Sequence, residues 1–429
     1  MQNLKLPWGR KPLFYGWVVA FIAMVASFAS GPGQAFVFAM FVDPIMADVG
    51  VSRTQISALY AVGTCISAAV ALGASYIIDN LGPRKMLLYS AVVFGLACIG
   101  ISFATGMVSL MVGFAALRAL GQSAIAVSVT LLTAQWFVRY RGRAMAIMSM
   151  GFSLSNALFP PISQMLITWL GWRDAYRTLG VAVWIMILPA TFFLVRDRPE
   201  QMGLHTDGLP PDPDQPQPTP DRQENSHQRP VIWRSLRFWI LALPLCAGPF
   251  VTTSLIFHQA SIFAERGLSP EVAASAFIPF ALTSALTTVV VGFLAEHIEP
   301  KWILLGNLIF LIVGVLFLQL VSSPLEAVIY SLIVGAFAGT LSVVSNVLWA
   351  YYYGRENLGA YQGASLTVII TGAAIGPLPL AAFQGIFGNY TVGLYVYASL
   401  PLICALPLLW FRSRYSASQP TKTSYATSG

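Results

Sequence analysis

Residues 207–230 read DGLPPDPDQPQPTPDRQENSHQRP and interrupt an otherwise apolar chain. A stretch so rich in Pro, Asp and Gln cannot bury enough apolar surface to offset the conformational entropy lost on ordering. We therefore predict that this stretch is flexible and that it belongs to a cytoplasmic linker over residues 196–235, with an apolar half of the chain on each side of it.

The apolar segments on both sides of the linker are long enough to cross a bilayer, which takes about 20 mainly apolar residues in a helix. They fall at about 14–41, 54–78, 86–105, 108–134, 144–170 and 177–195, then at about 236–263, 271–294, 302–320, 325–350, 359–385 and 391–411. We predict an all-α membrane protein of twelve transmembrane helices. One six-helix bundle spans 1–195, a second spans 236–414, and residues 415–429 form a disordered tail.

Composition excludes a water-soluble protein. Of the 429 residues, 56% are hydrophobic and only 10% are charged, whereas soluble domains are about 25% charged. The four cysteines lie in apolar runs without C-x-x-C spacing, which indicates neither a disulfide framework nor a metal site. We expect no cofactor and no catalytic residue.

The basic residues are distributed as the positive-inside rule requires. With a cytoplasmic N-terminus, Arg53, Arg173, Arg177 and Arg266 alone face outward, Arg118 lies within a span, and the rest of the 24 Lys and Arg residues face inward. The net charge of +7 therefore reports topology and not a nucleic-acid footprint. We expect a multi-pass protein of a bacterial inner (plasma) membrane, with both termini cytoplasmic.

The two halves repeat at an offset of 217 residues. This offset aligns Gly31-Pro32 with Gly248-Pro249, Gly142 with Gly359, Pro160 with Pro377, Asp79 with Glu296 and Arg84 with Lys301. Parallel six-span repeats are a known transporter plan, in which paired helix interruptions point to a midplane site. We expect Gly31-Pro32 and Gly248-Pro249 to interrupt their helices; the alternative is that each merely kinks a packed helix.

The loop after the second span resembles a conserved loop of the major facilitator superfamily. Residues 79–85, Asp-Asn-Leu-Gly-Pro-Arg-Lys, resemble the D-x-x-G-R-[RK] pattern with one additional proline, and residues 296–301 resemble a degenerate second copy. Arg118-Ala-Leu-Gly-Gln resembles the R-x-x-x-G stretch of the fourth span. The resemblance covers essentially the whole chain and implies a secondary transporter. Separately, we expect the protein to function as a monomer, although the sequence does not settle the oligomeric state.

A narrower resemblance concerns the ends of two spans. Phe14-Tyr15-Gly16-Trp17 and the segment from Trp136 to Ala146 resemble the monocarboxylate and oxalate/formate branch. That branch implies a small organic anion as substrate, moved with protons or by exchange. Its members commonly carry an Arg in span eight and, in oxalate exchangers, a Lys in span eleven. This chain has neither, so the substrate class stays open.

Arg118 is the sharpest candidate for substrate binding. An Arg near the bilayer centre costs about 2.5–3.5 kcal/mol even on lenient scales, and no carboxylate lies deep in any span to pair with it. A planar guanidinium suits a carboxylate or phosphate. The alternative role for Arg118 is to brace neighbouring helices.

Other polar residues recur at helical spacing, so that each span presents one polar face. The candidates for a substrate-binding lining are Gln34, Tyr60, Gln122, Asn156, His258, Asn346 and Trp349. The alternative for each is a contact between helices. His258 is also the candidate proton carrier, because imidazole titrates near neutral pH.

Charges in the inward-facing loops suggest gating. The superfamily resemblance implies that Asp79 and Glu296 pair with basic groups and latch one state, and we add Arg84, Arg143 and Lys301 to the gating candidates. The leading prediction is thus a carrier of a small organic anion, and the alternative is an exporter of amphipathic compounds. H-E-x-x-H, G-x-S-x-G and P-loop motifs are absent from the sequence, which argues against an enzyme or an ATP-driven pump.

Overall fold

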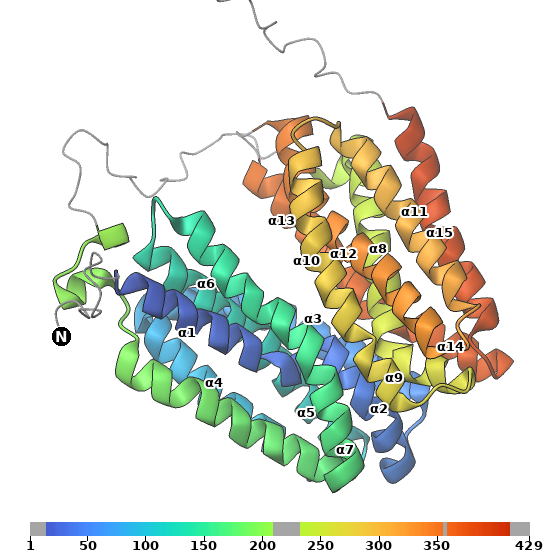
Figure 1. Ribbon diagram of the computed structural model, residues 1–429, viewed down its shortest axis with the longest axis horizontal. Helices are drawn as coiled ribbons and strands as arrows, with labels where there is room; N and C mark the ends of the chain where they lie inside the picture. Colours follow the sequence, from blue (N-terminus) through green and yellow to red (C-terminus); the bar gives the residue numbers. More distant parts are fainter. Residues whose placement is uncertain (1–13, 209–231, 355–357, 412–429) are drawn as a thin grey trace, which may run out of the picture.

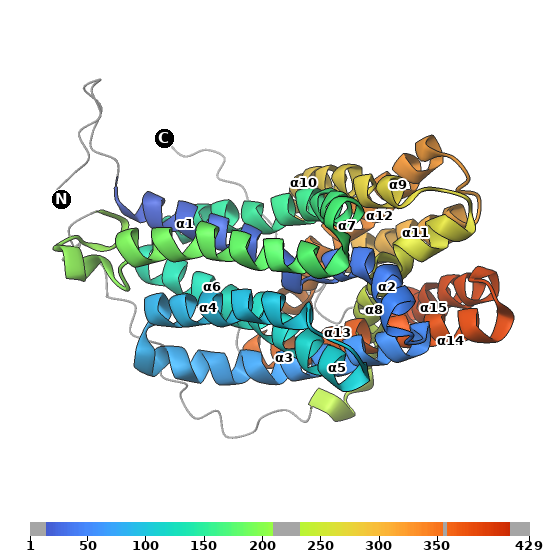
Figure 2. The same ribbon diagram turned by 90° about the horizontal axis from the view of Figure 1, so that it is seen from below.

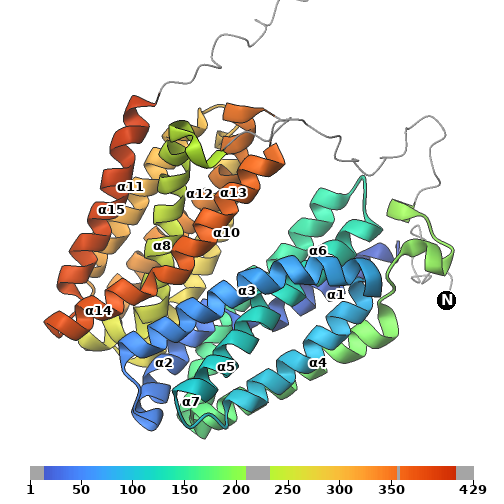
Figure 3. The ribbon, with the colours of Figure 1, turned by 180° about the vertical axis from the view of Figure 1, so that it is seen from behind.

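The computed structural model describes residues 14–208, 232–354 and 358–411, with side chains undescribed at 71–80 and 358–359. The regular structure in these residues is helical and forms two groups of helices inclined to one another (Figure 1). The first group is coloured blue to green and the second yellow to red; Figure 3 shows the same division from behind. The predicted all-α membrane fold is confirmed.

The first bundle is built from the residues before the linker. Its elements are α1 (Gly16–Ala29), η1 (Gly31–Gly33), α2 (Ala35–Val49), α3 (Arg53–Leu81), α4 (Pro83–Ile101), α5 (Met107–Leu117), η2 (Arg118–Ala124), α6 (Ile125–Trp136) and α7 (Arg141–Leu194). Gly50 ends α2 at φ 74°, and Gly171, at φ 76°, separates two helical parts of α7. A residue without Cβ adopts these left-handed conformations readily.

The second bundle follows the linker. Its helices are α8 (Leu236–Glu265), α9 (Pro270–Ser275), α10 (Phe277–Leu294), α11 (Pro300–Leu318), α12 (Pro324–Tyr353), α13 (Leu358–Ile375), α14 (Pro377–Phe387) and α15 (Thr391–Trp410). Pro occupies the first position of several of these helices, where its missing N–H costs nothing. Ser323 and Glu326 form a capping box at the start of α12.

Nine helices of the described residues are long and apolar enough to cross a membrane. One of them, α7, contains the fifth and sixth predicted runs, on either side of Gly171. The first predicted run is divided between α1 and α2 by η1. This arrangement is consistent with twelve spans.

The predicted interruption of two equivalent helices occurs in only one of them. In the first bundle, Gln34 is extended (φ −96°, ψ 154°) and separates η1 from α2. In the second bundle α8 runs unbroken through Gly248 and Pro249, so the prediction for that helix was wrong. The residue after Pro32 is Gly33, which lies against the backbone of η2, whereas the residue after Pro249 is Phe250, whose ring packs on Tyr397 with 5.3 Å between centroids.

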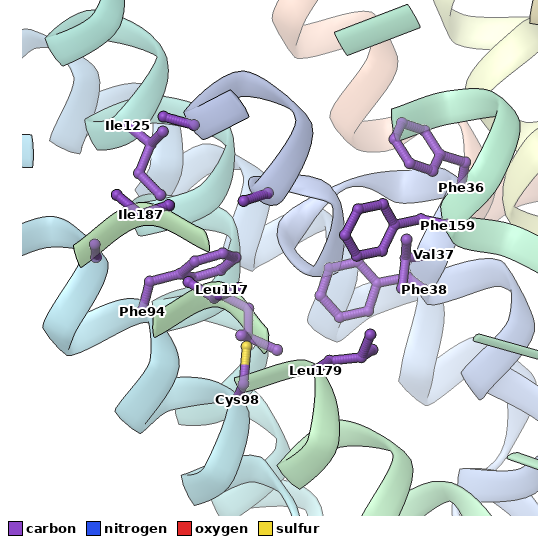
Figure 4. Close-up of a cluster of buried hydrophobic side chains, with 14 of the residues drawn as sticks. Phe36, Val37, Phe38, Phe94, Cys98, Leu117, Ile125, Phe159, Leu179 and Ile187 are labelled. Atoms are coloured by element: carbon purple, nitrogen blue, oxygen red, sulfur yellow. The ribbon is translucent and has the colours of Figure 1, made fainter. Parts of the chain in front are cut away.

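Buried apolar side chains, among them Phe38, Phe94 and Phe159, form the core of the first bundle (Figure 4). Phe94 and Phe159 are buried there, and their rings lie where a Cβ on Gly121 and on Gly31 would otherwise project. The second bundle has two buried clusters of its own. Phe257, Ala274 and Phe277 of the second bundle join the core of the first, so the apolar interior is continuous where the bundles meet.

The first part of the predicted linker, residues 196–208, packs against the first bundle. Asp207 accepts hydrogen bonds from the backbone N–H groups of Val138, Arg139 and Tyr140, at 3.0, 2.7 and 3.1 Å. These residues precede α7, so one carboxylate organises the turn between α6 and α7. The prediction of a flexible segment at residues 209–231 and the prediction of a disordered tail both fall on residues outside the described ones.

Within the described ranges, the main contacts between the two bundles lie at one end. We call this the closed end; it carries the turns at Gly50, Gly267 and Gly388, whereas the linker end carries Gly208 and Ile232. Contacts between bundles pair α2 with α8, α7 with α9 and α10, and α3 with α13 and α14. In Figures 1 and 3 the two groups converge at α2, α9 and α14 and stand apart toward α6 and α13.

Candidate functional site

Arg118 opens η2, a seven-residue π-helical segment between α5 and α6. The segment lies against the broken first span, because a Cβ on Gly33 would stand 2.4 Å from the Leu117 carbonyl oxygen and 2.9 Å from the Gly121 Cα. π-helical turns are rare and frequently occur at functional sites. Two irregular backbone segments therefore touch in the middle of the first bundle.

The Arg118 side chain is almost fully enclosed, with 3% of the residue exposed. Its Nη1 donates to the Gly33 carbonyl at 3.1 Å and its Nε donates to Thr64 Oγ1 at 3.2 Å. The guanidinium carbon lies 4.8 Å from the centroid of the Tyr60 ring. Each of these partners is formally neutral.

The charge on Arg118 is not compensated by a carboxylate within the described part of the chain, where the four ion pairs all involve other residues. A guanidinium offers five N–H donors, of which the described residues engage two. The arrangement can act chemically as an anion-binding fork, and it can also brace α3 against η1.

Two other predicted lining residues lie beside Arg118. Tyr60 is buried over the guanidinium, and Gln34 donates to the Gly121 carbonyl at 3.4 Å. Gln122 and Asn156 belong to the same bundle, and Gln122 Oε1 and Asn156 Oδ1 are buried without a hydrogen-bond partner among the described residues. The interior of the first bundle thus combines the buried Arg118 with amide oxygens that accept no hydrogen bond from the described residues.

The predicted residues of the second bundle lie in three different environments. His258 is fully buried, with Nε2 2.9 Å from the Pro377 carbonyl and Nδ1 3.4 Å from the Tyr390 hydroxyl. Asn346 is exposed and donates to the Ser342 carbonyl at 2.7 Å. Trp349 is fully buried and stacks on Phe238 with 5.3 Å between centroids, so it does not share the exposed face of Asn346.

Several polar side chains in the middle of apolar helices are nevertheless exposed. They are Ser149 and Ser153 on α7, Ser342 and Asn346 on α12, and Thr367 and Thr371 on α13. Polar groups within membrane spans generally face a bundle interior or a water-filled cavity. These positions therefore favour a polar lining on α7, α12 and α13.

Three of the five predicted gating residues have described side-chain contacts, and none of these contacts joins one bundle to the other. Arg84 donates from its backbone to Asp197 Oδ1 at 2.8 Å and from Nη2 to the Phe192 carbonyl at 2.7 Å. Arg143 lies 5.5 Å from the centroid of the Tyr140 ring, and Lys301 Nζ lies 3.8 Å from Glu299 Oε2. Glu296 is exposed, and the side chain of Asp79 lies outside the described residues. Latching by this set stays a prediction.

A polar contact between the bundles was missed by sequence reasoning. The Ser261 hydroxyl of α8 lies 2.9 Å from both carboxylate oxygens of Asp43 in α2, and Arg53 pairs with the same carboxylate. The sequence gives only a weak signal, since Asp43 is one of two acids that follow an apolar run and Ser261 is one of many serines.

Comparison with known families and structures gives a consistent match. The family model described as Major Facilitator Superfamily matches residues 16–277 and 252–426. A solved D-xylose–proton symporter has a TM-score of 0.68 at 15% identity, covering 92% of this chain and 97% of that one.

Three curated relatives are named for three different compounds. A probable sulfoacetate transporter of Cupriavidus necator is 26% identical over 37% of this chain, and the match spans only 36% of that relative. A 3-(3-hydroxy-phenyl)propionate transporter of Escherichia coli is 25% identical, over 86% of this chain and 87% of its own length. A chloramphenicol resistance protein of Streptomyces lividans is 23% identical, over 93% and 97%.

Proposed function

The chain belongs to the major facilitator superfamily, and from this premise we propose that it carries a small organic anion, first of all a monocarboxylate, across a membrane by alternating access. The protein is a multi-pass integral membrane protein. The proposed working unit is a monomer, because one chain supplies both bundles, divided as 1–195 and 236–414 by the linker. We further propose a bacterial inner membrane with both termini cytoplasmic.

The observation that carries the anion proposal is the buried, uncompensated charge of Arg118. Its described partners are the Gly33 carbonyl, the Thr64 hydroxyl and the Tyr60 ring. Burying a charge is costly unless an opposite charge or several hydrogen bonds compensate it. A carboxylate substrate would supply that charge, with Gln34, Gln122 and Asn156 beside it to contact its polar groups.

The arrangement of the bundles supports alternating access. They touch at the closed end and diverge toward the linker end (Figure 1). With a cytoplasmic N-terminus this is the inward-open state, and Asn346 with the exposed polar residues of α7, α12 and α13 would line the open space. In the opposite state the linker end closes. The residues that would then form contacts are Trp349 and the gating set Asp79, Arg84, Arg143, Glu296 and Lys301.

Two relatives support the substrate class. Sulfoacetate and 3-(3-hydroxy-phenyl)propionate, the substrates in the names of two of them, are both organic anions at neutral pH. The relative named for chloramphenicol resistance favours the second candidate, an exporter of amphipathic compounds.

Uptake into proteoliposomes tests the proposal. Purified full-length protein is expected to take up short monocarboxylates with saturation, and the same compounds should raise its unfolding temperature because a ligand of the folded state stabilises it. Empty liposomes are the control. Saturable transport of uncharged amphipathic drugs with no carboxylate flux would select the exporter instead.

Coupling is tested at His258. We propose it as the proton carrier in a symport mechanism, and replacement by Gln keeps a donor for the Pro377 carbonyl while removing the titratable ring. The expected result is that His258→Gln loses the stimulation of uptake by an inward proton gradient but still exchanges labelled for unlabelled substrate. Unchanged stimulation in the variant would remove His258 from the mechanism and favour anion exchange.

A further inference from the structure

A polar cluster joins the two bundles at the closed end. Asp43 of α2 accepts a hydrogen bond from the Ser261 hydroxyl of α8, which lies 2.9 Å from both Oδ1 and Oδ2. Nη2 of Arg53 lies 2.5 Å from Asp43 Oδ1. Figure 2 places α2 next to α8 between the two groups of helices. The cluster therefore bridges the surfaces that must separate if this end is to open.

Local structure explains why these three side chains meet. Asp43 lies two turns before the end of α2, and the left-handed Gly50 turns the chain back so that Arg53, the first residue of α3, returns to it. Arg53 is 15% exposed and Asp43 is 38% exposed, so the pair stands at the edge of the seam. Nη1 of Arg53 is buried without a partner among the described residues, which leaves Asp43 as its ionic partner there.

The cluster borders an apolar seam that leads to the candidate site. Phe257 of α8 packs on Tyr60 of α3 with 4.7 Å between ring centroids, and Tyr60 in turn covers the guanidinium of Arg118 at 4.8 Å. Phe36 and Phe277 extend the same seam, 6.4 Å apart. Separating α8 from α2 and α3 would therefore remove Phe257 from the Tyr60 ring, while Tyr60 itself stays with Arg118 in the first bundle.

We propose that Asp43 and Ser261 form a latch that holds the closed end shut, with Arg53 positioning the carboxylate. This inference rests on the proposed alternating access and assigns a positioning role to residues outside the candidate substrate site. A hydrogen bond to a carboxylate is stronger than a neutral one and contributes selectively to the closed state. Losing this hydrogen bond is expected to raise the equilibrium constant for opening at this end about tenfold.

Hydrogen–deuterium exchange of the purified full chain, without substrate, tests the latch. In Ser261→Ala, the peptides that cover α2, the start of α3 and the end of α8 are expected to exchange about tenfold faster. Ser331→Ala is the matched control, because Ser331 is also buried in the second bundle but donates only to Ala327 of its own helix, at 2.8 Å. Ser261→Thr keeps the hydroxyl and should restore slow exchange.

Asp43→Asn gives a second, independent reading. The amide keeps an oxygen to accept from Ser261 but loses the ion pair with Arg53, so exchange at the closed end should rise while the unfolding temperature shows that the protein remains folded. Equal exchange in wild type, Ser261→Ala and Asp43→Asn would overturn the latch. Because exchange is measured without substrate, that result would leave the anion proposal untouched, and a failure of carboxylate uptake would leave the latch untouched.

Discussion

Replacing Arg118 with alanine is expected to impair saturable uptake of the anion severely while the protein still inserts and folds. The substitution removes the one basic side chain that lies well inside a span. A hydrogen-bonded charge pair that is broken at one partner costs about 2–5 kcal/mol, so the affinity for a carboxylate should fall about 30-fold or more. Uptake kinetics and thermal-shift titrations with the same carboxylate measure this loss.

Two further variants separate binding from bracing. Arg118→Lys keeps the charge but loses the planar fork, and is expected to retain weak uptake with a raised KM. Thr64→Val removes the 3.2 Å hydrogen bond to Nε but leaves the charge in place, so uptake should persist. If Thr64→Val fails as completely as Arg118→Ala, or if Arg118→Ala transports normally, the guanidinium is a structural brace and the anion proposal loses its main support.

The all-helical, multi-pass membrane fold and the buried position of Arg118 were readable from the sequence, because the bilayer restricts which residues a span can contain. A span must be long and apolar, so the runs and the polar break between them stand out. A charge inside a span is costly, so a single Arg in an apolar run is an exception that calls for a role. Neither inference needs any knowledge of which helices touch.

The sequence did not show which side chains of different helices are in contact. Asn346 and Trp349 are three residues apart and were placed on one polar face, yet Asn346 is exposed and Trp349 is fully buried against Phe238. Residues at i and i+3 point in directions about 60° apart around a helix. The packing of α8 against α12 decides which of the two side chains is buried. The partners of Arg118 from Gly33 and Thr64, and the pairing of Asp43 with Ser261, are likewise set by tertiary packing.

The offset of 217 residues identified the two bundles but not their differences. Gly31-Pro32 and Gly248-Pro249 are equivalent in sequence, but only the first lies in a broken helix. The break depends on Gly33, which lets the backbone approach Leu117 and places a carbonyl oxygen on Arg118. The difference between the bundles therefore coincides with the candidate site, because the bundle that contains Arg118 is the one whose first span is interrupted.

Replacing Gly151 with alanine is expected to lower the unfolding temperature strongly. Gly151 lies in α7 where it crosses α1, and a Cβ there would stand 2.0 Å from the carbonyl oxygen and 2.8 Å from the carbonyl carbon of Met24. These are backbone atoms, so no side chain can rotate away, and the two helices must separate. Overpacking a core costs about 1–3 kcal/mol, and the upper part of that range is expected here.

Gly142 provides the matched control in the same helix. It is exposed, and a Cβ built on it meets no atom within 4 Å, so Gly142→Ala should be neutral or slightly stabilising. Thermal unfolding in detergent compares the two variants with wild type. An unchanged unfolding temperature in Gly151→Ala would mean that α1 and α7 are not in close contact, and the first bundle would then lack the rigidity that a rocking movement requires. Because α1 leads directly into η1, such a loosened contact would also leave the Gly33 carbonyl free to move away from Arg118.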